Sequence, residues 1–209
     1  MKVTDVTVQK NNKHRVSVFV DNEYAFSLDE TDAVLLKIKP GRELSQSELD
    51  RCIMESGYTK ALSKAFDMLS RKPYSRKELA DKLSQSGYDE AIVFEVAEEL
   101  ESLGYINDAD YAALFLEHCL SKMWGKKKIR YEMKQKGLSD EIIAETLGSL
   151  SDENTEDEMT ELILARYRGD DMNDIKTKAR ITRYFASRGF DFALIDKAIR
   201  KAIEVTGNE

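Results

Sequence analysis

The 209-residue sequence has few cysteines, and it lacks the sequence features of a secretion signal. It has two prolines and two cysteines, Cys52 and Cys119. Two cysteines are too few for a disulfide framework and fit a reducing compartment. The amino-terminal segment lacks the apolar core of a signal peptide, and no apolar run approaches the ~20 residues that span a bilayer. These absences predict a cytoplasmic protein that does not enter a membrane.

Side chains suited to catalysis or metal binding are also scarce. His14 lies near an expected hairpin turn, and His118 lies near an expected helix end, where its charged form suits the helix dipole. The cysteines have no partners at zinc spacing, and the phosphate-binding glycine loops are absent. Helix capping explains Asp108 and Asp110 better than a metal site does. We therefore expect no enzyme activity, no metal site and no cofactor.

A pattern does recur three times, centred on Gly87, Gly137 and Gly189. Apolar residues lie eight and four positions before each glycine and again from five to thirteen positions after it. Spacings of three and four indicate helices with one apolar face. Each glycine is expected to end a helix with positive φ, and the next helix is expected to be capped by Asp89, Ser139 or Asp191. A period near 50 residues predicts tandem helical units.

The apolar faces predict a small core in each repeat. The first core is expected to contain Leu79, Leu83, Val93, Val96 and Leu100, and the second Ile129, Met133, Ile143 and Leu147. Tyr74 and Trp124 each precede their repeat's glycine by 13 residues. Both aromatic side chains are expected in the elbow between the first and second helices of a repeat.

The residues before the repeats favour a small sheet. Residues 3–8, 15–20 and 24–28 are rich in β-branched and aromatic residues and predict a three-stranded antiparallel meander. A helix over residues 31–38 is expected to support the sheet through Val34, Leu35 and Ile38. Ser45 and Glu48 form a capping-box pattern for a further helix, which Gly57 is expected to end.

The expected fold is mainly α: three tandem three-helix repeats in an elongated array, preceded by a small β-meander-containing N-terminal region. The N-terminal region is assigned to residues 1–57, and the repeats to residues 58–106, 107–150 and 151–209. Within the last repeat, residues 151–158 are expected to be an acidic linker, Met159 to begin the first helix, and residues 207–209 to form a short tail.

Charge is unevenly distributed along the chain. The net charge is −7, yet residues 122–137, which we call the basic island, carry +6. Lys127, Arg130 and Lys134 share one expected helical face. The candidate partner-contact residues are Lys122, Lys126, Lys127, Lys128, Arg130, Lys134, Lys176, Arg180 and Arg183. A solvated helix face is the ordinary explanation of such runs, but their concentration in an acidic protein favours contact with phosphates or an acidic protein surface.

Several of these segments resemble the RecX family of bacterial recombination regulators. Residues 69–79 (Leu-Ser-Arg-Lys-Pro-Tyr-Ser-Arg-Lys-Glu-Leu), the turn over residues 82–88, and residues 103–112, which begin Leu-Gly-Tyr-Ile-Asn-Asp, carry the resemblance. Trp124-Gly125 followed by lysines, and Lys136-Gly137-Leu138, are similar to the family's second repeat. The resemblance covers about residues 60–200, and the amino-terminal strands resemble an extension found in some Gram-positive members.

The resemblance implies a modulator of the RecA recombinase in homologous recombination, DNA repair and the SOS response. Members of the family bind the groove of the RecA filament on single-stranded DNA, inhibit ATP hydrolysis and strand exchange, and promote filament loss, without catalytic residues. For this chain it implies a monomer whose contact with single-stranded DNA is indirect or weak. The alternative is a nucleic-acid-binding module, because helical hairpins with a basic second helix also occur in helix-turn-helix proteins.

Overall fold

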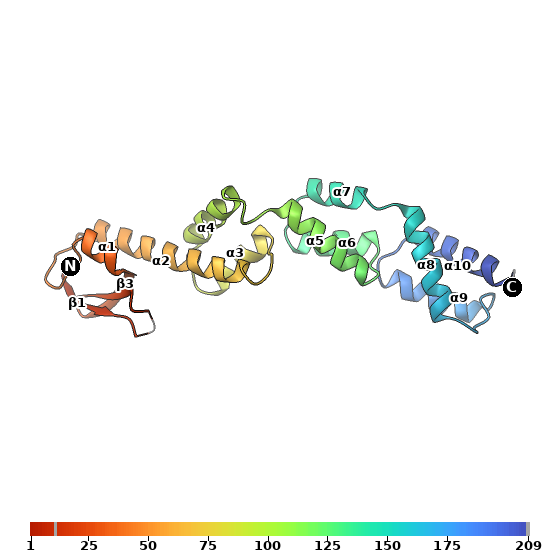
Figure 1. Cartoon of the computed structure of the whole chain (residues 1–209), viewed down its shortest axis with the longest axis horizontal. Helices are drawn as coiled ribbons and strands as arrows, with labels where there is room; N and C mark the ends of the chain where they lie inside the picture. The colour runs from red at the N-terminus through yellow and green to blue at the C-terminus, as the bar shows by residue number, and fades with distance from the viewer. Residues whose placement is uncertain (11, 208–209) are drawn as a thin grey trace. The chain divides into compact units, whose positions relative to one another are not determined.

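The computed structural model describes residues 1–10 and 12–207, which form a three-stranded sheet followed by ten helices (Figure 1). This is the predicted mainly α fold with an amino-terminal sheet. The chain forms two compact units: Met1–Tyr74 with Leu79–Ile106, and Ser75–Glu78 with Asn107 onward. The four-part division at residues 57, 106 and 150 stays a prediction. In the expected tail, Asn208 and Glu209 lie outside the described residues.

The sheet of the first unit is the predicted antiparallel meander. Strands β1 (Val3–Val8), β2 (Arg15–Val20) and β3 (Glu23–Asp29) pair in the order β1-β2-β3. Asp21 and Asn22 connect β2 to β3 with φ of 49° and 71°, as a tight hairpin turn requires. Alternate residues of β2 are buried, so one face of the sheet packs on a core.

The helix predicted over residues 31–38 forms next to the sheet, but two of its three expected core side chains face outward. Helix α1 (Glu30–Leu35) is one residue short of two turns, and Val34 and Leu35 are each 73% exposed. The prediction for these two side chains was wrong, because Ala33 and Ile38 are the residues that turn inward. The sheet also packs on helix α2 (Gln46–Leu69), whose Leu49 and Cys52 join the same core.

Gly57 does not end a helix, contrary to the sequence prediction. Helix α2 runs through it as one continuous helix, beginning at the predicted capping box of Ser45 and Glu48. A Cβ atom at Gly57 would lie 2.5 Å from Cδ1 of Ile92. The glycine therefore allows α4 (Glu90–Ser102) to pack closely against α2, and the second half of α2 is the first helix of the first repeat.

The first repeat is completed by α3 (Arg76–Gln85) and α4. Its predicted core is confirmed, since the five expected side chains belong to one cluster and none is more than 5% exposed. Tyr74 packs against this cluster, with the Lys72 ammonium 4.3 Å from its ring centre. The aromatic side chain therefore contributes to the hydrophobic core while its outer face remains available to a cation.

The second unit contains two further three-helix groups. The first comprises α5 (Asp108–Ser121), α6 (Lys126–Gln135) and α7 (Asp140–Gly148), and the second α8 (Asp152–Arg166), α9 (Ile175–Ala186) and α10 (Phe192–Gly207). Each group has its own core, and the predicted Ile129, Met133, Ile143 and Leu147 lie together in the first. Trp124 packs against that core, as its predicted elbow position requires.

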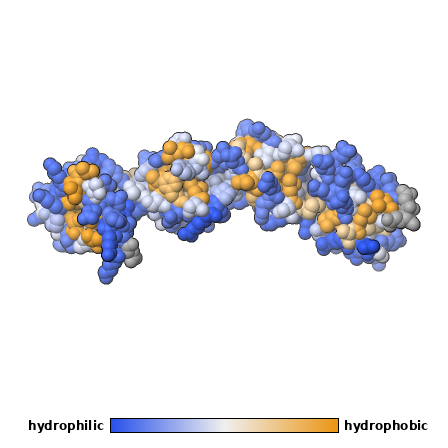
Figure 2. All heavy atoms as spheres, viewed as in Figure 1, coloured by the Kyte–Doolittle hydropathy of each residue, from blue (hydrophilic) through white to orange (hydrophobic). Residues whose placement is uncertain are grey.

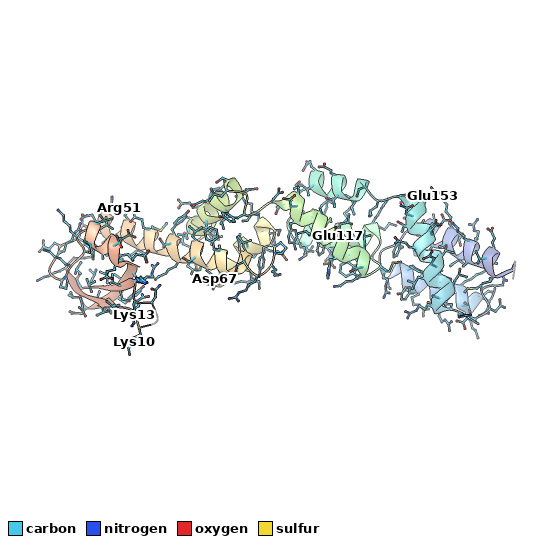
Figure 3. The ribbon with its side chains drawn as sticks, viewed as in Figure 1. Lys10, Lys13, Arg51, Asp67, Glu117 and Glu153 are labelled. Carbon is cyan, nitrogen blue, oxygen red and sulfur yellow. The ribbon has the colours of Figure 1, made fainter. Side chains whose placement is uncertain are left out.

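Residues 152–158 are helical, so the prediction of a linker there was wrong. Ser151 caps α8 by accepting from the backbone N–H of Asn154, and Asp152 and Glu153 occupy the first turn. Acidic residues at this end of a helix are stabilised by its dipole, and Glu153 projects from it (Figure 3). The helix was missed because its first seven residues are all polar and its apolar side begins only at Met159.

The three glycines and their caps are confirmed. Gly87, Gly137 and Gly189 have φ of 86°, 81° and 84°. The side chains of Asp89, Ser139 and Asp191 accept from the backbone N–H of Ala91, Ile142 and Ala193, respectively. The same helix–turn–helix construction therefore occurs in all three repeats. Among the described residues, no helix is both long and apolar enough to cross a membrane.

Candidate partner-binding surface

Helix α6 presents the basic side chains that the sequence singled out. Ile129 and Met133 are fully buried on one side of the helix. The basic residues, which are spaced three and four positions apart, therefore lie on the outward side. Lys127, Arg130 and Lys134 are all exposed. The predicted basic face therefore exists on the surface of the second unit.

The amino-terminal end of α6 is held by the carboxyl-terminal end of α9. The backbone N–H of Gly125 donates to the carbonyl of Arg188 at 2.8 Å, and that of Lys127 donates to the carbonyl of Gly189 at 3.2 Å. A Cβ atom at Gly125 would lie 2.5 Å from the Gly189 backbone, so only glycine permits this approach. The contact places a negative helix end against a positive one, and we call it the α6–α9 joint.

The other end of α6 is held in a similar way by residues Ser75–Glu78 of the same unit. The hydroxyl of Ser75 donates to the carbonyl of Lys136 at 2.7 Å. A Cβ atom at Gly137 would lie 2.5 Å from Cβ of Lys77. Both ends of α6 are thus anchored, so its basic face is carried on a constrained helix.

Lys136 belongs to the basic island but serves this anchoring contact. Its ammonium group donates to the Glu78 carboxylate at 2.6 Å and lies 4.9 Å from the ring centre of Phe115. Burial opposes the charged form of Lys136, but its hydrogen bonds to Glu78 and Tyr111 outweigh this and raise its pKa. Burial likewise opposes the Glu78 carboxylate, but hydrogen bonds from Lys136 and Tyr111 lower its pKa. Burial, followed by the bond to Glu78, raises the pKa of Tyr111 to about 12.

Four of the nine candidate contact residues form ion pairs within the molecule. The pairs are Lys126 with Asp152 at 2.6 Å, Lys127 with Asp191 at 2.6 Å, Lys134 with Asp140 at 2.9 Å, and Arg180 with Asp170. The basic island is therefore less positive toward a partner than its sequence charge of +6 indicates. These pairs are solvent-exposed, so a partner can replace the internal carboxylates at little cost in stability.

Two other candidates, Lys122 and Lys128, lie against Trp124. Their ammonium groups are 5.3 Å and 4.2 Å from its ring. This arrangement extends the predicted elbow role of Trp124, because the half-buried ring also holds two cations at the start of α6. Sequence spacing alone did not reveal this contact.

The remaining three candidates are Arg130, Lys176 and Arg183. All are exposed, and none forms an ion pair within the part of the chain that the structure describes. They come from α6 and α9, the helices that meet at the α6–α9 joint. Tyr131, next to Arg130, is 62% exposed and was not predicted as a contact residue. Arg130 and Tyr131 are therefore both accessible to an incoming partner.

The described residues contain no group of three histidine, cysteine or acidic side chains placed to hold a metal ion. Cys52 and Cys119 are buried free thiols.

Three family models match the chain and together cover more than half of it. The Regulatory protein RecX N-terminal domain matches residues 1–45, the first three-helix domain of RecX matches residues 61–100, and the second matches residues 107–147. The domains follow one another in the order in which the sheet and first two repeats occur in the structure.

Curated relatives match nearly the whole chain. Regulatory protein RecX of Clostridium beijerinckii is 29% identical over 207 residues, which span 98% of this chain and 97% of the relative. Regulatory protein RecX of Clostridium botulinum strain Eklund 17B is 31% identical over 207 residues, which span 97% and 96%, respectively.

Two solved structures have the same arrangement of elements. A crystal structure of regulatory protein RecX matches with a TM-score of 0.67 at 22% identity, covering 100% of this chain and 99% of that one. The crystal structure of RecX from Lactobacillus salivarius matches with a TM-score of 0.62 at 25% identity, covering 70% of this chain and 96% of that one. The first similarity supports the fold alone.

Proposed function

Because the chain belongs to the RecX family of regulatory proteins, we propose that it binds the groove of the RecA filament on single-stranded DNA and inhibits RecA. The affected activities are ATP hydrolysis, strand exchange and filament growth during recombination and DNA repair. The ordered match of three RecX domains carries this proposal. The protein acts in the cytoplasm as a monomer, and its contact with the DNA strand is indirect.

The surface chemistry supports binding to a charged macromolecule. Arg130, Lys176 and Arg183 have no internal ion pair among the described residues, and the exposed pairs of Lys127 and Lys134 can exchange their carboxylates for those of a partner. Charged contacts of this kind increase association rates and specificity. Because α6 is anchored at both ends, little conformational entropy is lost when a partner binds to it.

Cosedimentation with RecA filaments tests this proposal. The protein should pellet with RecA assembled on single-stranded DNA and remain in the supernatant with the DNA alone. A saturable stoichiometry with the filament is the expected result. Equal recovery with and without RecA would contradict binding to the filament.

The second candidate function is direct binding to nucleic acid. It is favoured by the exposed Tyr131 beside the unpaired Arg130, since aromatic and basic side chains together bind single strands. This function predicts binding to DNA alone, weakening steeply as salt rises because counterions are released. The filament-dependent function predicts little binding to DNA alone at any salt concentration.

A further inference from the structure

A cavity of about 340 Å³ lies in the first unit between β3, α1 and α2. Phe26, Leu28 and Cys52 line it, and each is at most 9% exposed. Leu35 also lines it but is 73% exposed, so this part of the cavity wall reaches the surface. Apolar residues are visible on the outer surface of this amino-terminal region (Figure 2). An exposed leucine beside an apolar hollow is typical of an interaction site.

The charged side chains that line the cavity are mainly acidic. They are Asp29, Asp32 and Glu55, with Arg15 as the only cation among the lining residues described. Arg15 is already engaged, because its guanidinium donates to the carbonyl of Ser27 at 3.2 Å and lies 3.5 Å from Asp29.

The negative charges of the other two carboxylates, Asp32 and Glu55, are less fully compensated by nearby cations. Glu55 lies 3.9 Å from Arg51, which projects from α2 (Figure 3). Asp32 forms no ion pair within residues 1–10 and 12–207. The cavity therefore combines an apolar lining with excess negative charge.

We propose that this cavity binds a lysine or arginine side chain of a protein partner, with an apolar neighbour of that side chain resting on Leu35. Such side chains have an aliphatic stem that packs on apolar walls and a cationic head that pairs with carboxylates. The acidic lining repels phosphates, so the occupant is protein rather than nucleic acid. The partner is the RecA filament, which makes this inference rest on the proposed function and adds a contact far in sequence from the basic island.

Alkylation of Cys52 reports directly on occupancy of the cavity. Cys119, fully buried in the second unit, is the internal control. Burial raises the pKa of both thiols, that of Cys119 to about 11, so iodoacetamide labelling is followed at a pH of about 8.5. Peptide mass spectrometry separates the two sites. Filament binding should slow alkylation of Cys52 in proportion to the bound fraction and leave Cys119 unchanged.

Three variants then distinguish the cavity from its surroundings. Leu35→Asn removes the apolar contact without adding charge, and Asp32→Lys reverses a lining charge, so each should weaken filament binding about tenfold, as the loss of one important contact does. Val34→Asn is the matched control, because Val34 is also 73% exposed on α1 but does not line the cavity. It should bind within about twofold of the parent. Circular dichroism verifies that all three variants fold.

The outcomes separate the two proposals. A filament-bound protein whose Cys52 reacts at the free rate would overturn the cavity proposal and leave the proposed function standing. An equal loss of binding in Val34→Asn would assign the contact to the outer side of α1 and also overturn it. A parent protein that does not bind the filament would overturn both proposals.

Discussion

Replacing Gly189 by alanine tests whether the α6–α9 joint is as close as the structure indicates. Gly189 has φ of 84°, so the strain of an alanine there, partly offset by the lower conformational entropy of the unfolded chain, costs on the order of 1 kcal/mol. Its Cβ would also lie 2.5 Å from the backbone nitrogen of Lys128, which forces the joint open. Losing the two backbone hydrogen bonds of the joint costs about 1–3 kcal/mol more. We therefore expect a total loss of about 2–4 kcal/mol in the free energy of unfolding.

Gly169→Ala is the matched control in the same unit. Gly169 has a nearly identical φ of 88°, but a Cβ atom there would meet nothing within 4 Å. It should lose only the strain component, about 1 kcal/mol. Urea unfolding of both variants can be followed by the fluorescence of Trp124, the only tryptophan, which adjoins Gly125 at the joint. Equal losses of stability in the two variants would show that the joint yields easily and would refute its role in anchoring α6.

The other predictions concern charge and the core. Changing Lys127, Arg130 and Lys134 together to Glu should weaken filament binding and RecA inhibition with little effect on the melting temperature, because these side chains are exposed. A folded variant that inhibits like the parent would identify a merely solvated face. Glu78→Gln should destabilise the protein at pH 7. Because the pKa of Glu78 is lowered in the folded protein, its stabilising effect is lost on protonation, so the difference in stability from the parent should shrink as pH falls below the ordinary glutamate pKa of 4.5. A pH-independent difference in urea midpoints would contradict this. Leu83→Ala should cost roughly 2–5 kcal/mol, measured by far-ultraviolet circular dichroism in urea, and a cost below about 0.5 kcal/mol would be incompatible with its complete burial.

Local features of the fold could be predicted from sequence because local physics determines them. A glycine that follows an apolar stripe and precedes a capping residue is strongly favoured to end a helix in the left-handed conformation. Gly137 and Ser139 were predicted in these roles from the neighbouring sequence alone, and both are confirmed. The period of the repeat then placed the cores of the first two repeats correctly. Three short segments rich in β-branched and aromatic residues, separated by turns, likewise sufficed to predict the meander.

Features set by distant neighbours could not be predicted. From sequence, Gly57 is predicted to end a helix. Its role in the structure is to make room for Ile92, which packs against it from a distant helix. Val34 and Leu35 were predicted to be buried, but in the tertiary structure residues of α2 pack beneath the sheet where these two side chains were expected. In a helix as short as α1, the sequence pattern does not decide which side chains face the core, because the tertiary packing decides it.

The candidate surface divides in the same way. Exposure of Lys127, Arg130 and Lys134 followed from the helical period. Their pairing did not, because Asp191 comes from the turn after α9, 64 residues beyond Lys127. The identity of the cations that bind a partner stays a prediction, and Arg130, which forms no ion pair among residues 1–10 and 12–207, is the strongest single candidate.

The most direct test of the central claim is the DNA-dependent ATPase of RecA, measured on preformed filaments while this protein is added up to stoichiometric amounts. We predict a graded fall in the rate of ATP hydrolysis that saturates as the filament is covered and that persists at salt concentrations where the filament itself is stable. An unchanged rate at stoichiometric amounts of folded protein would contradict the proposed function.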